Sequence, residues 1–159
     1  PGSGSADGVD RPMGHMSKGR IAMCVKAVGL NFRDVLNVLG MYPGDPGAPG
    51  GDCSGVVVAS DGSGEGPQPG QAVFGLAGGS LASHVVASAQ TLVPVPPHLS
   101  HEQAATTPTV FLTVDAAIRN AAAVQRGERV LLPAAAGGVG LAAVQLVAAA
   151  GATAFATAG

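Results

Sequence analysis

A glycine-rich turn between an expected strand and an expected helix is the clearest chemical pattern in the sequence. The strand is expected over residues 129–136 and the helix over residues 141–150, and between them stand Gly137, Gly138, Val139 and Gly140. Glycines at such a place let the backbone bend sharply and approach a pyrophosphate, while the helix start offers unpaired N–H groups and a partial positive charge. The pattern therefore indicates either a dinucleotide-binding turn or a close helix–strand crossing that binds nothing.

The turn matches only part of the dinucleotide-binding fingerprint, because Ala143 stands where its third glycine is usual. A second strand is expected over residues 153–158, which completes a strand, turn, helix, strand unit. No charged residue follows Arg129, so a membrane span is an alternative interpretation of the last 30 residues. Pro133 and Gln145 would interrupt a lipid-facing helix, whereas buried parallel strands are expected to be continuously apolar. Pro133 cannot donate a ladder hydrogen bond, so the first strand is expected to end near it.

The composition excludes several classes of partner. The 159 residues include 8 basic and 10 acidic ones, a charged fraction of 11% against a usual value of about 25%. With a net charge of −2 and no basic run, neither a nucleic acid nor a membrane surface is an expected partner. Apolar residues make up 47% and aromatic residues 3%, so the core must be built from small side chains. Cys24 and Cys53 lack disulfide-framework or zinc spacing, which favours a reducing, cytoplasmic compartment.

The first two thirds of the chain predict a β-rich unit followed by helices. Residues 1–19 have the composition of a flexible leader or a cloning scar and show no secretory signal. A short helix is expected after Asn31, which can cap it, with Asp34 near its positive end and Gly40 at its left-handed stop. Strands are expected over residues 20–28, 54–60, 71–75 and 81–87, a loop over 41–51, a proline-rich connector over 92–100, and helices over 102–125 with a restart near Pro108.

Several motifs then occur in the order found in one known family. The sequence resembles the enoyl reductase domains of polyketide synthases, which belong to the medium-chain dehydrogenase/reductase superfamily, and the resemblance extends over residues 20–158. Residues 30–36 (Leu-Asn-Phe-Arg-Asp-Val-Leu) and 39–44 (Leu-Gly-Met-Tyr-Pro-Gly) are the most specific matches. Further matches are residues 55–57, 70–75, 84–86, 94–96, 102–105, 110–113, 127–131 and 134–144.

The resemblance implies an α/β plus β fold in two parts. These are a GroES-like substrate domain over residues 20–107 and the first βαβ unit of an incomplete Rossmann-type domain over residues 108–159. It also implies transfer of a hydride from NADPH to the β-carbon of a trans-2-enoyl thioester carried on an acyl carrier protein. The glycine turn would take the pyrophosphate, and Asn31, Thr109 and Thr113 would lie near the nicotinamide. Read from the residues alone, Asn31 could be only a helix cap and the two threonines only packing residues.

Departures from the family pattern leave other readings open. Residues 50–52 (Gly-Gly-Asp) stand where zinc-dependent relatives carry Gly-His-Glu, so no catalytic zinc is expected. Leu36 stands near the place of a proton-donating tyrosine, so no proton donor is assigned. The sequence stops at Gly159, before the expected reader of the ribose 2′ position, which predicts a remainder of the reductase or neighbouring synthase domains as partners. The alternatives are a truncated, non-catalytic scaffold domain and a free-standing, zinc-independent quinone or alkene reductase.

Overall fold

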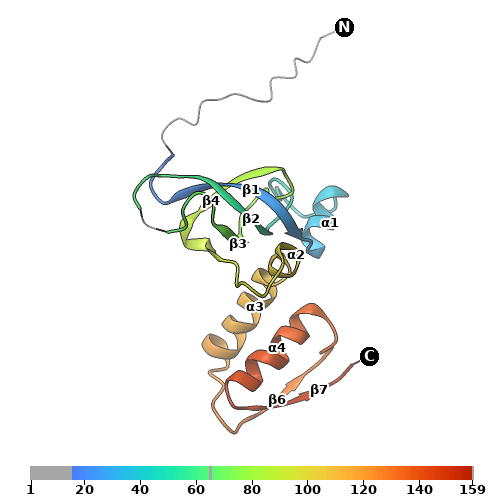
Figure 1. Cartoon of the computed structure of the whole chain (residues 1–159). Helices are drawn as coiled ribbons and strands as arrows, with labels where there is room; N and C mark the ends of the chain where they lie inside the picture. The colour runs from blue at the N-terminus through green and yellow to red at the C-terminus, as the bar shows by residue number, and fades with distance from the viewer. Residues whose placement is uncertain (1–15, 65, 159) are drawn as a thin grey trace.

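The computed structural model describes residues 16–64 and 66–158, and their strands form two separate sheets (Figure 1). Five antiparallel strands follow the order β4-β1-β2-β3-β5, and two parallel strands, β6 and β7, form the second sheet. The expected leader lies almost entirely outside the described residues. The strands are β1 (Arg20–Gly29), β2 (Asp52–Ser60), β3 (Ala72–Leu76), β4 (His84–Ser88), β5 (Leu92–Pro94), β6 (Arg129–Leu132) and β7 (Thr153–Ala156).

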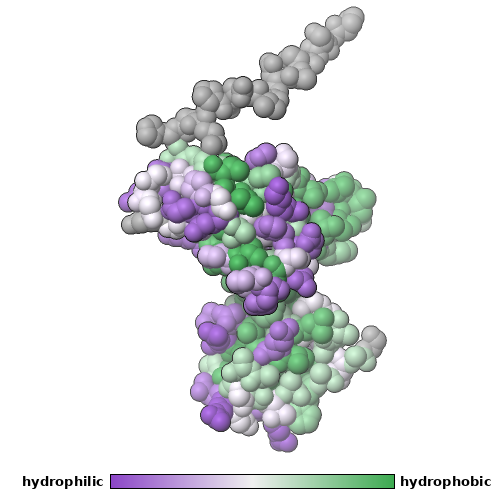
Figure 2. Space-filling model, viewed as in Figure 1, coloured by the Kyte–Doolittle hydropathy of each residue, from purple (hydrophilic) through white to green (hydrophobic). Residues whose placement is uncertain are grey.

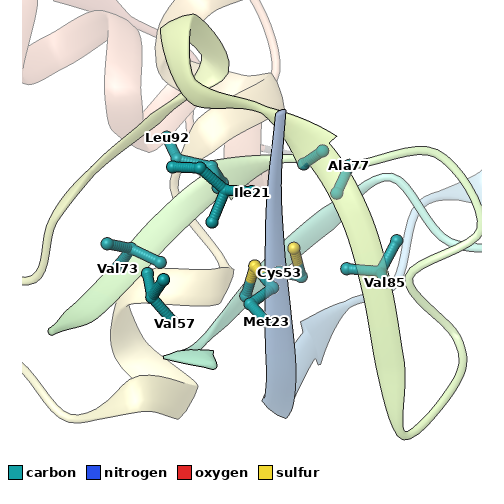
Figure 3. Close-up of a cluster of buried hydrophobic side chains, with 9 residues drawn as sticks. Ile21, Met23, Cys53, Val57, Val73, Ala77, Val85 and Leu92 are labelled. Atoms are coloured by element: carbon teal, nitrogen blue, oxygen red, sulfur yellow. The ribbon is translucent and has the colours of Figure 1, made fainter. Parts of the chain in front are cut away.

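The antiparallel sheet encloses the larger core. β1 lies between β2 and β4, and β2 continues the sheet to β3. Figure 3 shows side chains of these strands converging on one cluster that contains no aromatic ring. Its small members agree with the core that the composition predicts, and burying each valine, leucine, isoleucine or methionine side chain contributes about 1.5–3 kcal/mol. The cluster is Ile21, Met23, Cys53, Val57, Val73, Ala77, Val85, Ala87 and Leu92.

The predicted connector over residues 92–100 begins with a strand, so that prediction is wrong for its first residues. β5 pairs with the end of β3 as an edge strand, and Leu92 is buried in the core. Proline is tolerated on an edge strand, because no further strand needs its missing N–H. A 3₁₀ turn, η1 (Ala89–Thr91), precedes β5, and a Cβ on Gly75 would lie 1.9 Å from the Thr91 carbonyl oxygen. The glycine, at φ +152°, lets the two backbones meet.

The predicted short helix is confirmed as α1 (Phe32–Val38). Asn31 occupies its N-cap position, Asp34 lies in its first turn, and Gly40 follows its end at φ +66°. Much of its surface is apolar, and hydrophobic residues gather over α1 at the side of the molecule (Figure 2). The exposed apolar side chains in and beside this helix are Leu30, Phe32, Val35, Val38, Leu39 and Met41.

Three short helical segments join the two sheets. α2 (His101–Ala105) packs on β1, β2 and β3, and the buried Ser54 hydroxyl lies 2.7 Å from Nδ1 of His101. The predicted restart is confirmed, because α3 (Pro108–Asp115) begins with proline at its first position and runs into a π-helical turn, η2 (Ala116–Ala121). α3 contacts β2 and β3 on one side and α4 on the other, so it couples the antiparallel sheet to the parallel unit.

The last third of the chain confirms the predicted strand, turn, helix, strand unit. β6 ends at Leu132, four residues before the expected end at residue 136 and immediately before Pro133, and α4 (Gly138–Ala149) leads to β7, which pairs with β6 in parallel. α4 starts three residues earlier than predicted, because its first turn includes the glycines. A second core lies between this helix, α3 and η2 and consists of Val114, Ile118, Ala142, Ala143 and Val147. Among the described residues, no helix combines the length and apolar character needed to cross a bilayer.

The two cysteines differ in burial, which leads to a testable difference in reactivity. Cys53 is fully buried, and desolvation raises the pKa of its thiol to about 11, whereas Cys24 is partly exposed. Because the thiolate is the reactive form, iodoacetamide at about pH 8 is expected to alkylate Cys24 in the folded chain and Cys53 only after unfolding. Mass spectrometry of the labelled peptides measures this order. Equal labelling of both cysteines in the folded chain would contradict the buried position of Cys53.

The same shift predicts a loss of stability at alkaline pH. The unfolded chain ionises the Cys53 thiol above its ordinary pKa of 9.0, while the folded chain keeps the proton until about 11. The folded state then binds more protons than the unfolded state, so the free energy of unfolding falls as the pH rises through this range. Urea unfolding of the chain and of its Cys53→Ala variant, at about pH 8 and pH 10.5, isolates the effect, because only the parent chain contains this thiol.

Candidate functional site

The glycine turn forms the N-cap and first turn of α4 and leaves several backbone donors free. Gly137 is the N-cap residue, with an extended backbone at φ −79° and ψ 166°. The first amide to bond back to the cap is that of Leu141, which donates to the Gly137 carbonyl at 2.8 Å. The N–H groups of Gly138, Val139 and Gly140 precede that bond and have no carbonyl one turn back in the helix. The first turn of α4 carries no acidic side chain, so its positive end is free for an anion.

Close packing fixes where the turn lies. A Cβ on Gly140 would lie 2.5 Å from the Ala135 Cα and 2.6 Å from the Ala134 carbonyl oxygen. Only glycine therefore lets α4 approach the chain that leaves β6, and the non-glycine Ala134 takes a left-handed φ of +53° there. A Cβ on Gly138 would lie 3.4 Å from Val110 of α3, which places the start of the turn beside the first turn of that helix.

A buried carboxylate gathers two of the predicted nicotinamide-side residues. Asp52, the first residue of β2, is 2% exposed. Its Oδ2 accepts a hydrogen bond from Nδ2 of Asn31 at 3.1 Å. Its Oδ1 accepts from Oγ1 of Thr109 at 2.6 Å and from the Thr109 backbone N–H at 3.2 Å. Asn31 and Thr109, 78 positions apart in the sequence, are thus held by one side chain.

A second buried carboxylate ties α1 to the loop over residues 41–51. Asp34 accepts hydrogen bonds from the N–H of Asn31 and the N–H of Gly50, both at 2.9 Å. The Arg33 guanidinium adds a bond to the Pro46 carbonyl at 2.8 Å and lies 5.3 Å from the centre of the Tyr42 ring. The helix therefore holds the loop at several points.

This loop, α1 and α3 enclose a cleft of about 190 Å³, into which Arg33 brings a positive charge. Both Asn31 and Thr109 line it. An adjoining hollow of about 500 Å³ continues past Thr109 to the glycine-containing loop after β3. The lining of the smaller cleft is completed by Asp34, Asn37, Pro46, Ala48, Gly50 and Gly51. The lining of the two clefts includes a guanidinium, a carboxylate and three neutral polar side chains, those of Asn31, Asn37 and Thr109.

The predicted site residues do not all come together. Thr113 is exposed one turn farther along α3 and lines neither of these two clefts. Asp52 is the residue that the sequence analysis missed as part of the site. The signal that indicates it is an acidic residue directly after Gly50 and Gly51, where zinc-dependent relatives have a glutamate.

Two further observations bear on what the site could hold. A larger cavity of about 540 Å³ lies between β3, β5 and α3, but Phe74, Val93, Phe111 and similar apolar groups dominate it, and it contains none of the predicted site residues. Within residues 16–64 and 66–158, no three histidine, cysteine, aspartate or glutamate side chains gather as metal ligands would.

Comparisons with known proteins place this architecture in a family. Residues 17–97 match the alcohol dehydrogenase GroES-like domain, and the chain belongs to that family. A CurK enoyl reductase structure superposes with a TM-score of 0.83 at 39% identity over 94% of this chain and 49% of its own. A quinone oxidoreductase from Thermus thermophilus, solved also with NADPH, gives 0.73 at 39% identity over 94% and 48%.

The relatives found by sequence include proteins of polyketide synthases. The spectinabilin polyketide synthase system protein NorB of Streptomyces orinoci is 46% identical over 143 residues, which are 90% of this chain. The resemblance to the enoyl reductases of polyketide synthases, in the medium-chain dehydrogenase/reductase superfamily, is thereby confirmed. The chain spans 6% of NorB and about half of each of the two solved structures.

Proposed function

We propose that this chain is part of an enoyl reductase region of a polyketide synthase, which binds NADPH and reduces a trans-2-enoyl thioester carried on an acyl carrier protein. The observation that carries the proposal is the first turn of α4, whose free N–H groups and lack of acidic side chains suit a pyrophosphate. The similarity to a polyketide synthase and to an enoyl reductase structure supports the reaction class. We further propose the division into a substrate domain, residues 20–107, and a cofactor domain beginning at residue 108.

The residues present fit a dinucleotide. Gly137 and Gly138 are exposed, and a Cβ at Gly138 would meet only the Val110 side chain, so the surface beside the turn is open. In this proposal the turn holds the pyrophosphate, while Asn31 and Thr109 flank the nicotinamide from the cleft that they both line. We also propose that Thr113, which is exposed one turn farther along α3, lies near the bound cofactor. When bound, NADPH supplies the hydride, and the task of these side chains is to orient the ring against the alkene.

A fluorescence titration tests the proposal directly. NADPH added to the chain is expected to show saturable binding that inorganic pyrophosphate weakens by competition at the turn. Reduction of a crotonyl thioester, followed by loss of NADPH absorbance, is the matching test of activity. A folded chain, verified by circular dichroism, that binds no NADPH would overturn the proposal for this chain and leave the scaffold alternative.

A further inference from the structure

Asp52 connects three elements of the fold at one point. It starts β2, while Asn31 stands at the N-cap of α1 and Thr109 lies in the first turn of α3. Both oxygens of its carboxylate accept hydrogen bonds from these two residues, and the side chain is almost completely buried. Bonds from neutral donors to a carboxylate are stronger than bonds between neutral groups, so the two partners are firmly oriented.

We propose that Asp52 is a positioning residue that fixes the Asn31 amide and the Thr109 hydroxyl against the nicotinamide half of the cofactor. This inference rests on the proposed function. Burying a carboxylate is costly unless its oxygens are satisfied, and an apolar residue would fill the same space without that cost. The two polar residues that satisfy it both line the cleft, whereas Asp52 itself does not line it.

The position of Asp52 on a central strand of the sheet supports this role. β2 is paired on both sides, with β1 and with β3, so the carboxylate stands on a rigid strand. Its two partners lie at helix starts, Asn31 as the N-cap of the 7-residue α1 and Thr109 in the first turn of α3, where the helix alone does not hold a side chain in one place. A site is best oriented when side chains that contact a ligand are held by groups on rigid elements.

The test compares two ligands that share the pyrophosphate. ADP-ribose contains the pyrophosphate but no nicotinamide, so the Asp52→Asn variant is expected to raise the Kd of NADPH about tenfold and that of ADP-ribose less than twofold. The variant amide has one acceptor oxygen, so it cannot receive both partners, and it turns an NH₂ group toward one of their donors. NMR of the labelled chain is expected to show the Asn31 side-chain amide and the Thr109 amide shifting in the variant.

Ser54→Ala is the matched control. Ser54 is also buried in β2, but its hydroxyl bonds to the Val73 carbonyl and to His101, neither of which lines the cleft. It is expected to lower stability while both Kd values stay within twofold of the parent. Should Asp52→Asn fail to fold, Thr109→Val removes one of the donors that Asp52 holds at nearly the same volume, and the same selective loss of NADPH binding is expected.

The outcomes separate the two proposals. Equal weakening of NADPH and ADP-ribose, or no weakening of either, by the folded variant would overturn the positioning role while leaving cofactor binding intact. Absence of NADPH binding by the parent chain would overturn the proposed function and this inference with it, and it is seen before any variant is made.

Discussion

Replacing Gly140 by alanine is expected to lower the free energy of unfolding by about 3 kcal/mol, at the upper end of the cost of overpacking. The new methyl group would lie 2.5 Å from the Ala135 Cα and 2.6 Å from the Ala134 carbonyl oxygen. Both are backbone atoms, so a rotamer change cannot relieve the contact, and α4 must move away from the chain that follows β6. Urea unfolding followed by circular dichroism measures the loss.

Gly138→Ala is the matched control for this prediction. Gly138 lies in the same turn of the same helix, but its methyl group would meet only the Val110 side chain at an ordinary 3.4 Å. Alanine restricts the unfolded chain more than glycine does, so stability is expected to stay equal or rise by about 0.5 kcal/mol. Opposite signs for the two variants would show that α4 approaches the end of β6 at Gly140. Equal effects would mean that the close crossing does not exist in solution.

The parts of the fold that the sequence predicted well depend on local rules. Pro133 predicted the end of β6 because a missing N–H cannot continue a ladder, and the strand does end one residue before it. Gly40 predicted the stop of α1 because a left-handed residue is needed there, and it takes φ +66°. In both cases one residue type limits its own backbone, so no distant partner has to be known.

Other features depend on partners that no local pattern reveals. Prolines mark loops, so the sequence predicts a connector at β5, but burial of Leu92 and pairing with β3 determine its structure. Asp52 was missed because its role depends on Asn31, 21 positions before it, and Thr109, 57 positions after it. Family resemblance supplied Asn31 and Thr109 as candidates, and the structure brought them to one carboxylate, whereas Thr113 stays outside their cleft.

The Asp34→Ala variant is expected to lose about 3 kcal/mol of stability, because two donors lose their acceptor at once. Asp34 is buried and accepts from the N–H groups of Asn31 and Gly50 at 2.9 Å each. The Gly50 backbone is itself buried, so its N–H would remain without a partner and without water. The loss is measured by urea unfolding, and the exchange rate of the Gly50 amide is expected to rise with it.

Asp34→Asn and Asp45→Ala complete the comparison. Asparagine keeps one acceptor oxygen, so about half of the loss is expected, provided that this oxygen stays on one of the two N–H groups. Asp45 is an exposed aspartate of the loop that Asp34 holds, and it accepts a hydrogen bond from the nearby Gly47 N–H, so its alanine variant is expected to change stability by less than about 0.5 kcal/mol.

Asn31 lines the candidate cleft, and it is anchored through its N–H by Asp34 and through its side-chain amide by Asp52. The two carboxylates should therefore differ in effect. Loss of Asp34 should mainly lower stability, and loss of Asp52 should mainly lower affinity for the nicotinamide half. A large effect of Asp45→Ala, or none of Asp34→Ala, would contradict the anchoring of this loop by α1.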